Sequence, residues 1–222
     1  LTMGLTMAQF GVDLAWWAWA LIAWLLVTGL SLLSVDIGAK ILGVLLAVEL
    51  LSLIVTAVAI LINGGPEGAN VGASFDLGLV FAGGFAGTAG IALAFAFASF
   101  IGFEATAIYG EESKNPKRDV PRATYWAIGI ISGLFAVVSF AIVTGMGAGA
   151  IIDQVVERSG GLADPSAVLF SLAAEYVSPE IVVVMALLVV TSLFAGLLAF
   201  QNAAARYFFA MGRGGVMPSM LG

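Results

Sequence analysis

Long runs of apolar residues, separated by shorter polar stretches, make up most of the chain. Because a helix rises about 1.5 Å per residue, about 20 apolar residues are needed to cross the hydrocarbon core of a bilayer. Five segments reach that length, with predicted bounds of 16–35, 41–62, 91–109, 126–152 and 181–205. The pattern predicts an all-α integral membrane protein with about five transmembrane helices, organised as a single transmembrane domain over residues 1–222.

Two of the stretches between these segments predict further structure. Between the fourth and fifth segments, residues Ser166 to Tyr176 predict a short amphipathic helix at the membrane interface. Between the third and fourth segments, Pro116 is expected to end one helix. Pro121 is expected to begin the next helix, with Asp119 as its N-cap.

The composition agrees with a membrane protein, since 61% of the residues are hydrophobic and 10% are charged, against about 25% charged in soluble domains. The chain has no Cys and no His, which removes thiolate and imidazole metal ligands and the nucleophile–base pairs built from them. We therefore expect neither an enzyme nor a metal or cofactor site. The net charge is −6, but the acidic residues form no run, and nucleic acid binding is not expected.

The positions of Lys and Arg predict the orientation in the membrane. Seven of the eight fall in the stretches that follow the first, third and fifth segments, whereas Arg158 falls on the opposite side. Because positively charged loops are retained in the cytoplasm, those three stretches are predicted to be cytoplasmic. The glycine-rich loop after the second segment and the loop that carries Arg158 are predicted to be external.

The third apolar segment contains a carboxylate, Glu104, two residues after Gly102. A charged side chain inside a span costs about 2.5 to 3.5 kcal/mol on insertion scales, so it usually faces a cavity or a partner. Gly102 lowers helix stability by about 1 kcal/mol relative to Ala. The pair predicts a helix that breaks, as in transporters that build substrate sites from unwound backbone. Alternatively, Glu104 lies near the cytoplasmic end and reaches water there.

Two motifs resemble a known family. The stretch SFIGFEATAIYGEESKNPKRDVPRATY is similar to the sixth-span signature of the amino acid-polyamine-organocation (APC) superfamily of permeases, and QNAAARYFFAMGRGGVMPSML is similar to the end of the eighth span. The resemblance implies a leucine-transporter-type core of ten helices in two inverted repeats. The five segments here would correspond to family spans four to eight, so the chain is expected to be an internal fragment. The remainder of the same polypeptide would supply the missing spans, including the glycine-rich first span.

The resemblance also implies a function. It predicts secondary active transport of an amino acid or related amine, by symport or antiport, in a multi-pass protein of the plasma membrane. Proton coupling is expected in preference to sodium coupling. The partners would be that small-molecule substrate and the lipid bilayer. A membrane receptor or partner-binding scaffold of the same fold, which transports nothing, is the alternative.

The substrate-binding residues are carried over from the break in the family's sixth span. They are predicted to be Phe97, Ser99, Phe100, Ile101, Gly102, Phe103 and Glu104. In the family, freed backbone carbonyls at this break accept hydrogen bonds from the substrate's amino group, and an aromatic ring just before it acts as a lid. Phe97 and Phe100 are both candidates for that ring, and either could instead be part of the core.

Glu49 is the second carboxylate within an apolar segment, about 12 Å along the helix from Ile41. In some proton-coupled relatives the resembling position is a Lys that replaces a sodium ion, so the acid here departs from that pattern. Glu49 and Glu104 are the candidates for proton coupling, because a buried carboxylate can carry a proton. Glu49 could equally be a protonated residue that hydrogen-bonds a neighbouring helix. Thr191, Ser192 and Asn202 offer oxygens to an ion, or serve as ordinary helix–helix hydrogen-bonding groups.

Overall fold

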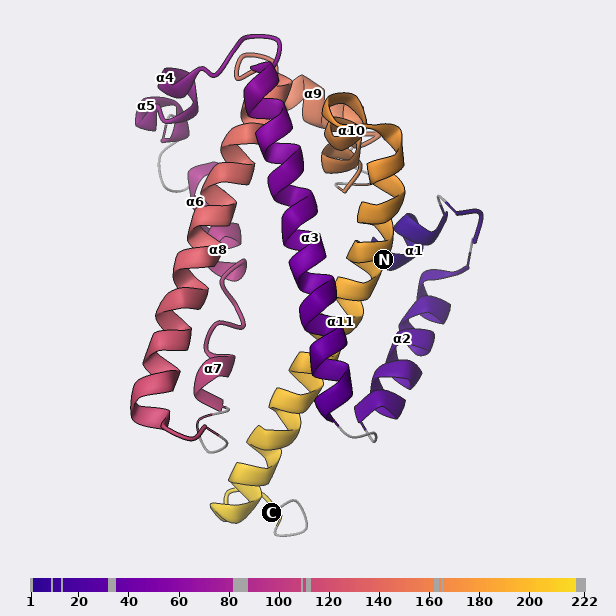
Figure 1. Ribbon diagram of the computed structural model, residues 1–222, viewed down its shortest axis with the longest axis vertical. Coiled ribbons are helices and arrows are strands. Elements are labelled where there is room, and N and C mark those ends of the chain that lie inside the picture. The colour runs from indigo at the N-terminus through magenta and orange to yellow at the C-terminus, as the bar shows by residue number, and fades with distance from the viewer. Residues whose placement is uncertain are drawn as a thin grey trace. The chain divides into compact units, whose positions relative to one another are not determined.

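The computed structural model describes residues 2–8, 10–12, 14–31, 35–81, 88–108, 110, 113–161, 164 and 166–218. Across these ranges the chain forms helices joined by turns, and none of the described residues lies in a strand (Figure 1). The contacts divide the chain into two compact units, one of residues 1–56 with 153–222 and one of residues 57–152.

The first unit is built around the long helix α11. Its helices are α1 (Thr2–Ala8), α2 (Trp16–Ser31), most of α3 (Val35–Asn63), most of α9 (Ile151–Arg158), α10 (Ser166–Tyr176) and α11 (Pro179–Arg213). The α10 helix packs on the first turns of α11 through a buried cluster of Phe170, Ala173, Met185 and Ala186. Leu53 of α3 packs against the same cluster. The core of this unit therefore lies where α3, α10 and α11 meet.

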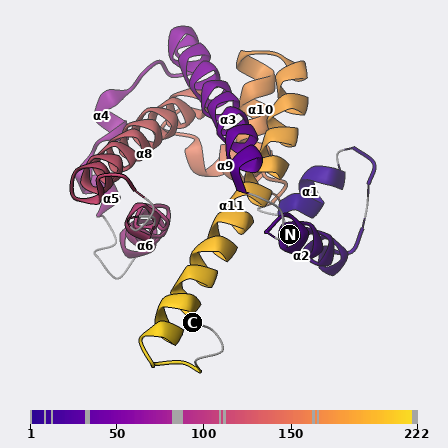
Figure 2. The same ribbon diagram turned by 60° about the horizontal axis from the view of Figure 1, so that its bottom comes forward.

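The second unit is built around α8 (Pro116–Met146). It also contains α4 (Val71–Ser74), α5 (Leu77–Val80), α6 (Thr88–Ala98) and α7 (Ala105–Ile108). Figure 2 shows α4, α5 and α6 near α8. The loop after α3 packs tightly on the end of α8, since a Cβ atom on Gly65 would lie 1.9 Å from the carbonyl oxygen of Thr144. In addition, Oε2 of Glu67 accepts a hydrogen bond from the N–H of Gly149 at 3.2 Å. These contacts place the loop after α3 against the C-terminal end of α8.

Among the residues that the structure describes, three helices are long and apolar enough to cross a membrane. They are Gly43–Asn63, Pro116–Met146 and Pro179–Arg213, which overlap the second, fourth and fifth predicted segments. The first predicted segment contains α2, a shorter apolar helix of 16 residues, and residues 32–34 lie outside the described ranges. The third is divided between α6 and α7, and Tyr109 also lies outside those ranges. The prediction of an all-α membrane protein is confirmed.

The start of α8 corrects the prediction made for the two prolines. Pro116 does not end a helix but begins α8, with Asn115 as the N-cap in place of Asp119. Proline is favourable at the first helical position because its missing N–H would have no helical partner there. Pro121 lies inside α8, where it removes one main-chain hydrogen bond. The α8 helix then ends at Met146, earlier than predicted, whereas α10 has the predicted bounds.

Candidate functional site

The third apolar segment is interrupted between α6 and α7. The α6 helix ends at Ala98, α7 begins at Ala105, and residues 99–104 between them form turns. We call residues 99–104 the break. Within it, Gly102 has a φ of +111°, a conformation that residues with a Cβ rarely adopt. The helix is therefore interrupted where the Gly102–Glu104 pair predicts it.

The Glu104 carboxylate bonds to the backbone of the break itself. Its Oε2 atom accepts a hydrogen bond from the N–H of Gly102 at 2.8 Å. An amide N–H that leaves a helix needs an acceptor, because a main-chain group without a partner is costly in a membrane. Glu104 supplies that acceptor from only two residues away. This contact gives a local reason for an acidic residue inside an apolar segment.

Two carbonyl groups in the break remain available. The N–H groups of Phe100, Ile101, Phe103 and Ala105 bond to carbonyls of Phe97, Ala98, Phe100 and Gly102. Within the described part of the chain, the carbonyls of Ser99 and Ile101 accept no hydrogen bond. In a continuous helix, both would be bonded to N–H groups four residues later. Unwinding has therefore left two acceptors free in the break.

The two aromatic candidates for the lid differ in their surroundings. Phe100 makes an edge-to-face contact with Phe135 of α8, with ring centroids 5.9 Å apart and an interplanar angle of 87°. Phe97 precedes the break on α6, and 78% of it is exposed in this chain. Phe100 is thus occupied by packing on α8, whereas Phe97 is free to contact another molecule or segment.

Glu49 lies in a line of polar side chains between α3 and α11. Ser52 and Thr56 follow it on α3 and are almost completely buried. The Thr56 hydroxyl contacts Sδ of Met185 at 4.0 Å, and the Glu49 carboxyl group lies near the Ser192 hydroxyl. Glu49 and Thr56 are seven residues apart on α3, and their partners Ser192 and Met185 are seven residues apart on α11. The residue numbers rise along α3 where they fall along α11. The two helices therefore pack antiparallel, with Glu49 facing a hydroxyl of α11. We call these residues the polar seam.

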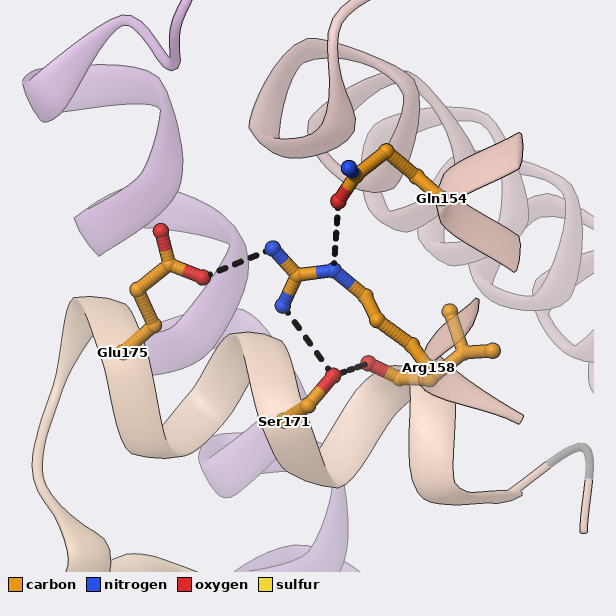
Figure 3. A network of polar contacts seen from close by, with 5 residues as sticks. Gln154, Arg158, Ser171 and Glu175 are labelled. Atoms are coloured by element: carbon orange, nitrogen blue, oxygen red, sulfur yellow. Dashed lines mark hydrogen bonds and ion pairs between the residues drawn. The ribbon is translucent and has the colours of Figure 1, made fainter. Parts of the chain in front are cut away.

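Arg158 makes three side-chain contacts, two of which link α9 to α10 (Figure 3). Its guanidinium donates hydrogen bonds to Glu175 at 2.8 Å, Ser171 at 3.2 Å and Gln154 at 3.0 Å. The bond to Glu175 is also an ion pair. Burial raises the pKa of Tyr176 above its usual value, with Glu175 adding to the shift and Arg158 opposing it. Arg158 therefore ties the two helices of this loop together.

The predicted site residues fall into two groups. Ser99 to Glu104 form the break in the second unit, with Phe97 just before it on α6, whereas Glu49 lies in the polar seam of the first unit. Sequence analysis did not single out the α8 residues that contact the break, because an apolar Phe or a Thr within a long span carries no distinguishing signal. Among the residues described, no group of three or more acidic side chains could hold a metal ion.

Comparisons with known proteins agree with the motifs. The amino acid permease family matches residues 1–222. The chain is 34% identical to the branched-chain amino acid permease BcaP of Lactococcus lactis subsp. cremoris (strain MG1363) over 141 residues, which are 63% of this chain and 28% of that protein. It is 31% identical to the branched-chain amino acid permease BcaP of Bacillus subtilis (strain 168) over 130 residues, which are 59% and 26%.

The matched region spans only about a quarter of the length of either relative. No solved structure matches the chain significantly. The family match nevertheless extends over all 222 residues and agrees with the APC resemblance of both motifs. The family and both relatives are permeases. This agrees with the prediction of a multi-pass protein of the plasma membrane that is not an enzyme. The chain therefore belongs to the amino acid permease family.

Proposed function

We propose that this chain is part of a longer permease that moves an amino acid across the membrane by secondary active transport, and that the break binds the substrate's amino group. The observation that carries the proposal is the pair of free carbonyls, Ser99 and Ile101, in a chain of the amino acid permease family. We call the longer protein the complete permease.

The chemistry of the break suits an ammonium group. An α-ammonium has three N–H donors and no acceptor, so it needs oxygen atoms arranged around it. Main-chain carbonyls supply such oxygens without placing a further charge in the membrane, and the unwound backbone of discontinuous helices in other transporters uses carbonyls to coordinate cations. In our proposal, the carboxylate of the substrate is bound by a segment of the complete permease outside this chain.

The aromatic ring of Phe97 supports an apolar side chain on the substrate. Phe97 is largely exposed beside the break, while Phe100 is packed against α8. Both curated relatives are branched-chain amino acid permeases. We therefore propose leucine, isoleucine and valine as substrates, with Phe97 as the lid.

Uptake by the complete permease in liposomes tests this function. We expect saturable uptake of labelled leucine, with leucine accumulating inside the liposomes when the external solution is more acidic. Accumulation should stop when a protonophore collapses the pH gradient. Unlabelled isoleucine and valine should compete, and an acidic or basic amino acid should not. Leucine binding without uptake under any imposed ion gradient would instead support the receptor-like alternative.

We propose Glu49 as the group that carries the coupling proton. Its side chain lies half-buried in the polar seam, and it faces the Ser192 hydroxyl of α11. A carboxyl group there can bind and release a proton, whereas a glutamine keeps the shape and the hydrogen bonding but cannot titrate.

The variant Glu49→Gln separates coupling from structure. If Glu49 carries the proton, Glu49→Gln should lose accumulation driven by a pH gradient while it keeps leucine binding and exchange of internal for external leucine. Wild-type accumulation in the variant would assign Glu49 to helix packing. Accumulation that follows a sodium gradient in the wild-type protein would replace the proton with sodium in this proposal.

A further inference from the structure

Two contacts with α8 lie on opposite sides of Gly102, one from Phe100 within the break and one from Thr106 in α7. On one side, Phe100 packs edge-to-face against Phe135. On the other, the hydroxyl oxygens of Thr106 and Thr124 are 2.5 Å apart, which joins α7 to α8. All four residues belong to the second unit. The break is thus attached to one uninterrupted helix on both sides of Gly102.

The spacing of the two contacts fits an unwound segment better than a helix. Thr124 and Phe135 are eleven residues apart on α8, which corresponds to about 16 Å along its axis. Their partners, Thr106 and Phe100, are six residues apart. Six residues would rise only about 9 Å as a helix but reach up to about 20 Å when extended. The attachment points on α8 therefore match the length of an open break.

The two threonine hydroxyls can make only two of their three possible donations. The Thr106 hydroxyl lies 3.1 Å from the carbonyl oxygen of Phe103, the Thr124 hydroxyl lies 2.9 Å from that of Val120, and the hydroxyls contact each other. Each hydroxyl has one hydrogen. Either Thr106 donates to Thr124 and Phe103 loses its hydroxyl donor, or Thr124 donates to Thr106 and Val120 loses its hydroxyl donor.

The second arrangement leaves each carbonyl with better hydrogen bonding. The Val120 carbonyl lies inside α8, where it also accepts the main-chain N–H four residues later. The Phe103 carbonyl lies in the break, where its main-chain bond from the Thr106 N–H is long, at 3.4 Å. The hydrogen is thus needed more at Phe103. In this arrangement Thr124 supports the break through Thr106.

We propose that Thr124 and Phe135 are positioning residues that hold the break open and thereby set the affinity for the substrate's amino group. Without these anchors, the segment can wind toward a continuous helix. The N–H groups of Phe103 and Ala105 would then bond to the carbonyls of Ser99 and Ile101, and the two free acceptors would be lost. This inference rests on the proposed function of the break.

Binding of labelled leucine to the purified complete permease tests the affinity. Thr124→Val, which keeps the shape but removes the hydroxyl, should weaken binding about three- to tenfold, the usual effect of one hydrogen bond. Thr124→Ser should bind within about twofold of wild type. Phe135→Leu should weaken binding, whereas Phe135→Tyr, which keeps the ring, should not. Ser139→Ala, an exposed position of α8, is the control.

A double-mutant cycle identifies the route of the effect. If Thr124 acts through Thr106, the variant with both Thr106→Val and Thr124→Val should bind about as weakly as either single variant. Additive losses would contradict the hydroxyl pair. Wild-type affinity in both Thr124→Val and Phe135→Leu would overturn the inference and leave the proposed function standing.

A distance measurement tests the anchors without any substrate. Spin labels on cysteines at Ala96 and Ala107, both exposed in this chain, would lie about 16 Å apart along a continuous helix. The wild-type background should give a longer distance, and Thr124→Val with Phe135→Leu should shift it toward the helical value. An unchanged distance would overturn the inference. If the wild-type permease binds no amino acid, the proposed function fails, and this distance still shows whether α8 holds the break open.

Discussion

The hydrogen bond that Glu104 makes explains why an acidic residue occurs inside an apolar segment. Its carboxylate bonds to the Gly102 N–H in a conformation that only glycine adopts readily. The acid and the glycine therefore act as a pair, in which Gly102 opens the helix and Glu104 satisfies the N–H that opening exposes. A role in proton coupling remains a separate prediction for the same side chain.

Two substitutions at Glu104 separate these roles. Glu104→Gln keeps a side-chain oxygen that can accept the Gly102 N–H, so leucine binding and pH-driven uptake should both persist. Glu104→Leu removes the acceptor of that N–H, which should lower both thermal stability and affinity. Binding and uptake assays on the two variants check this. Loss of pH-driven uptake with intact binding in Glu104→Gln would assign the coupling proton to Glu104.

At the scale of elements, α9 and α10 are held together by Arg158. One guanidinium contacts groups on both helices, and α10 in turn packs on α11 through a buried apolar cluster. Side-chain exposure at the ion pair is 19% for Arg158 and 49% for Glu175, so water screens part of the attraction. The geometry of the three hydrogen bonds therefore matters more to this loop than the charge alone.

Variants of the Arg158 network should rank by the number of contacts they lose. Glu175→Gln should cost at most about 1 kcal/mol, as expected for a partly exposed pair. Arg158→Ala should cost more, and Arg158→Lys should not restore stability because an ammonium cannot reach all three partners in the fork geometry of a guanidinium. Thermal unfolding followed by tryptophan fluorescence checks the order. Glu157→Gln, at an exposed position of α9, is the control, and equal melting temperatures for all four variants would contradict the account.

At the scale of the whole molecule, the charge bias predicts which loops face the cytoplasm, and single cysteines can test it because this chain has none. Ser159 is unsuitable as a reporter, since only 1% of it is exposed. Exposed Ala69 and Glu157 are better external positions, and exposed Lys117 is the cytoplasmic one. Cysteines at 69 and 157 should react with an impermeant thiol reagent added to intact cells, whereas one at 117 should react only after permeabilisation. The reverse pattern would invert the topology.

Much of this architecture could be predicted from the sequence because membrane spans have a strong local signal. The bounds of α10 and the interruption near Gly102 followed from apolar periodicity and from one glycine–acid pair. The start of α8 was predicted wrongly because Pro116 is compatible with either the end or the start of a helix. The anchors Thr124 and Phe135 could not be predicted, since their role depends on which face of α8 meets the break. That pairing is a property of the fold and leaves no local pattern.

The central claim is that the break binds substrate. The most direct test is the affinity for leucine of the complete permease carrying Gly102→Ala. A Cβ at Gly102 meets no atom of this chain within 4 Å, so the substitution acts through the φ of +111° alone. An alanine disfavours that conformation and should displace the neighbouring Ile101 carbonyl. We predict leucine binding at least about tenfold weaker, equivalent to about 1.4 kcal/mol, with an unchanged elution profile in size-exclusion chromatography. The control is Gly133→Ala in α8, where a Cβ also meets no atom within 4 Å, and it should bind leucine normally. Wild-type affinity in Gly102→Ala would contradict the claim that the break holds the substrate.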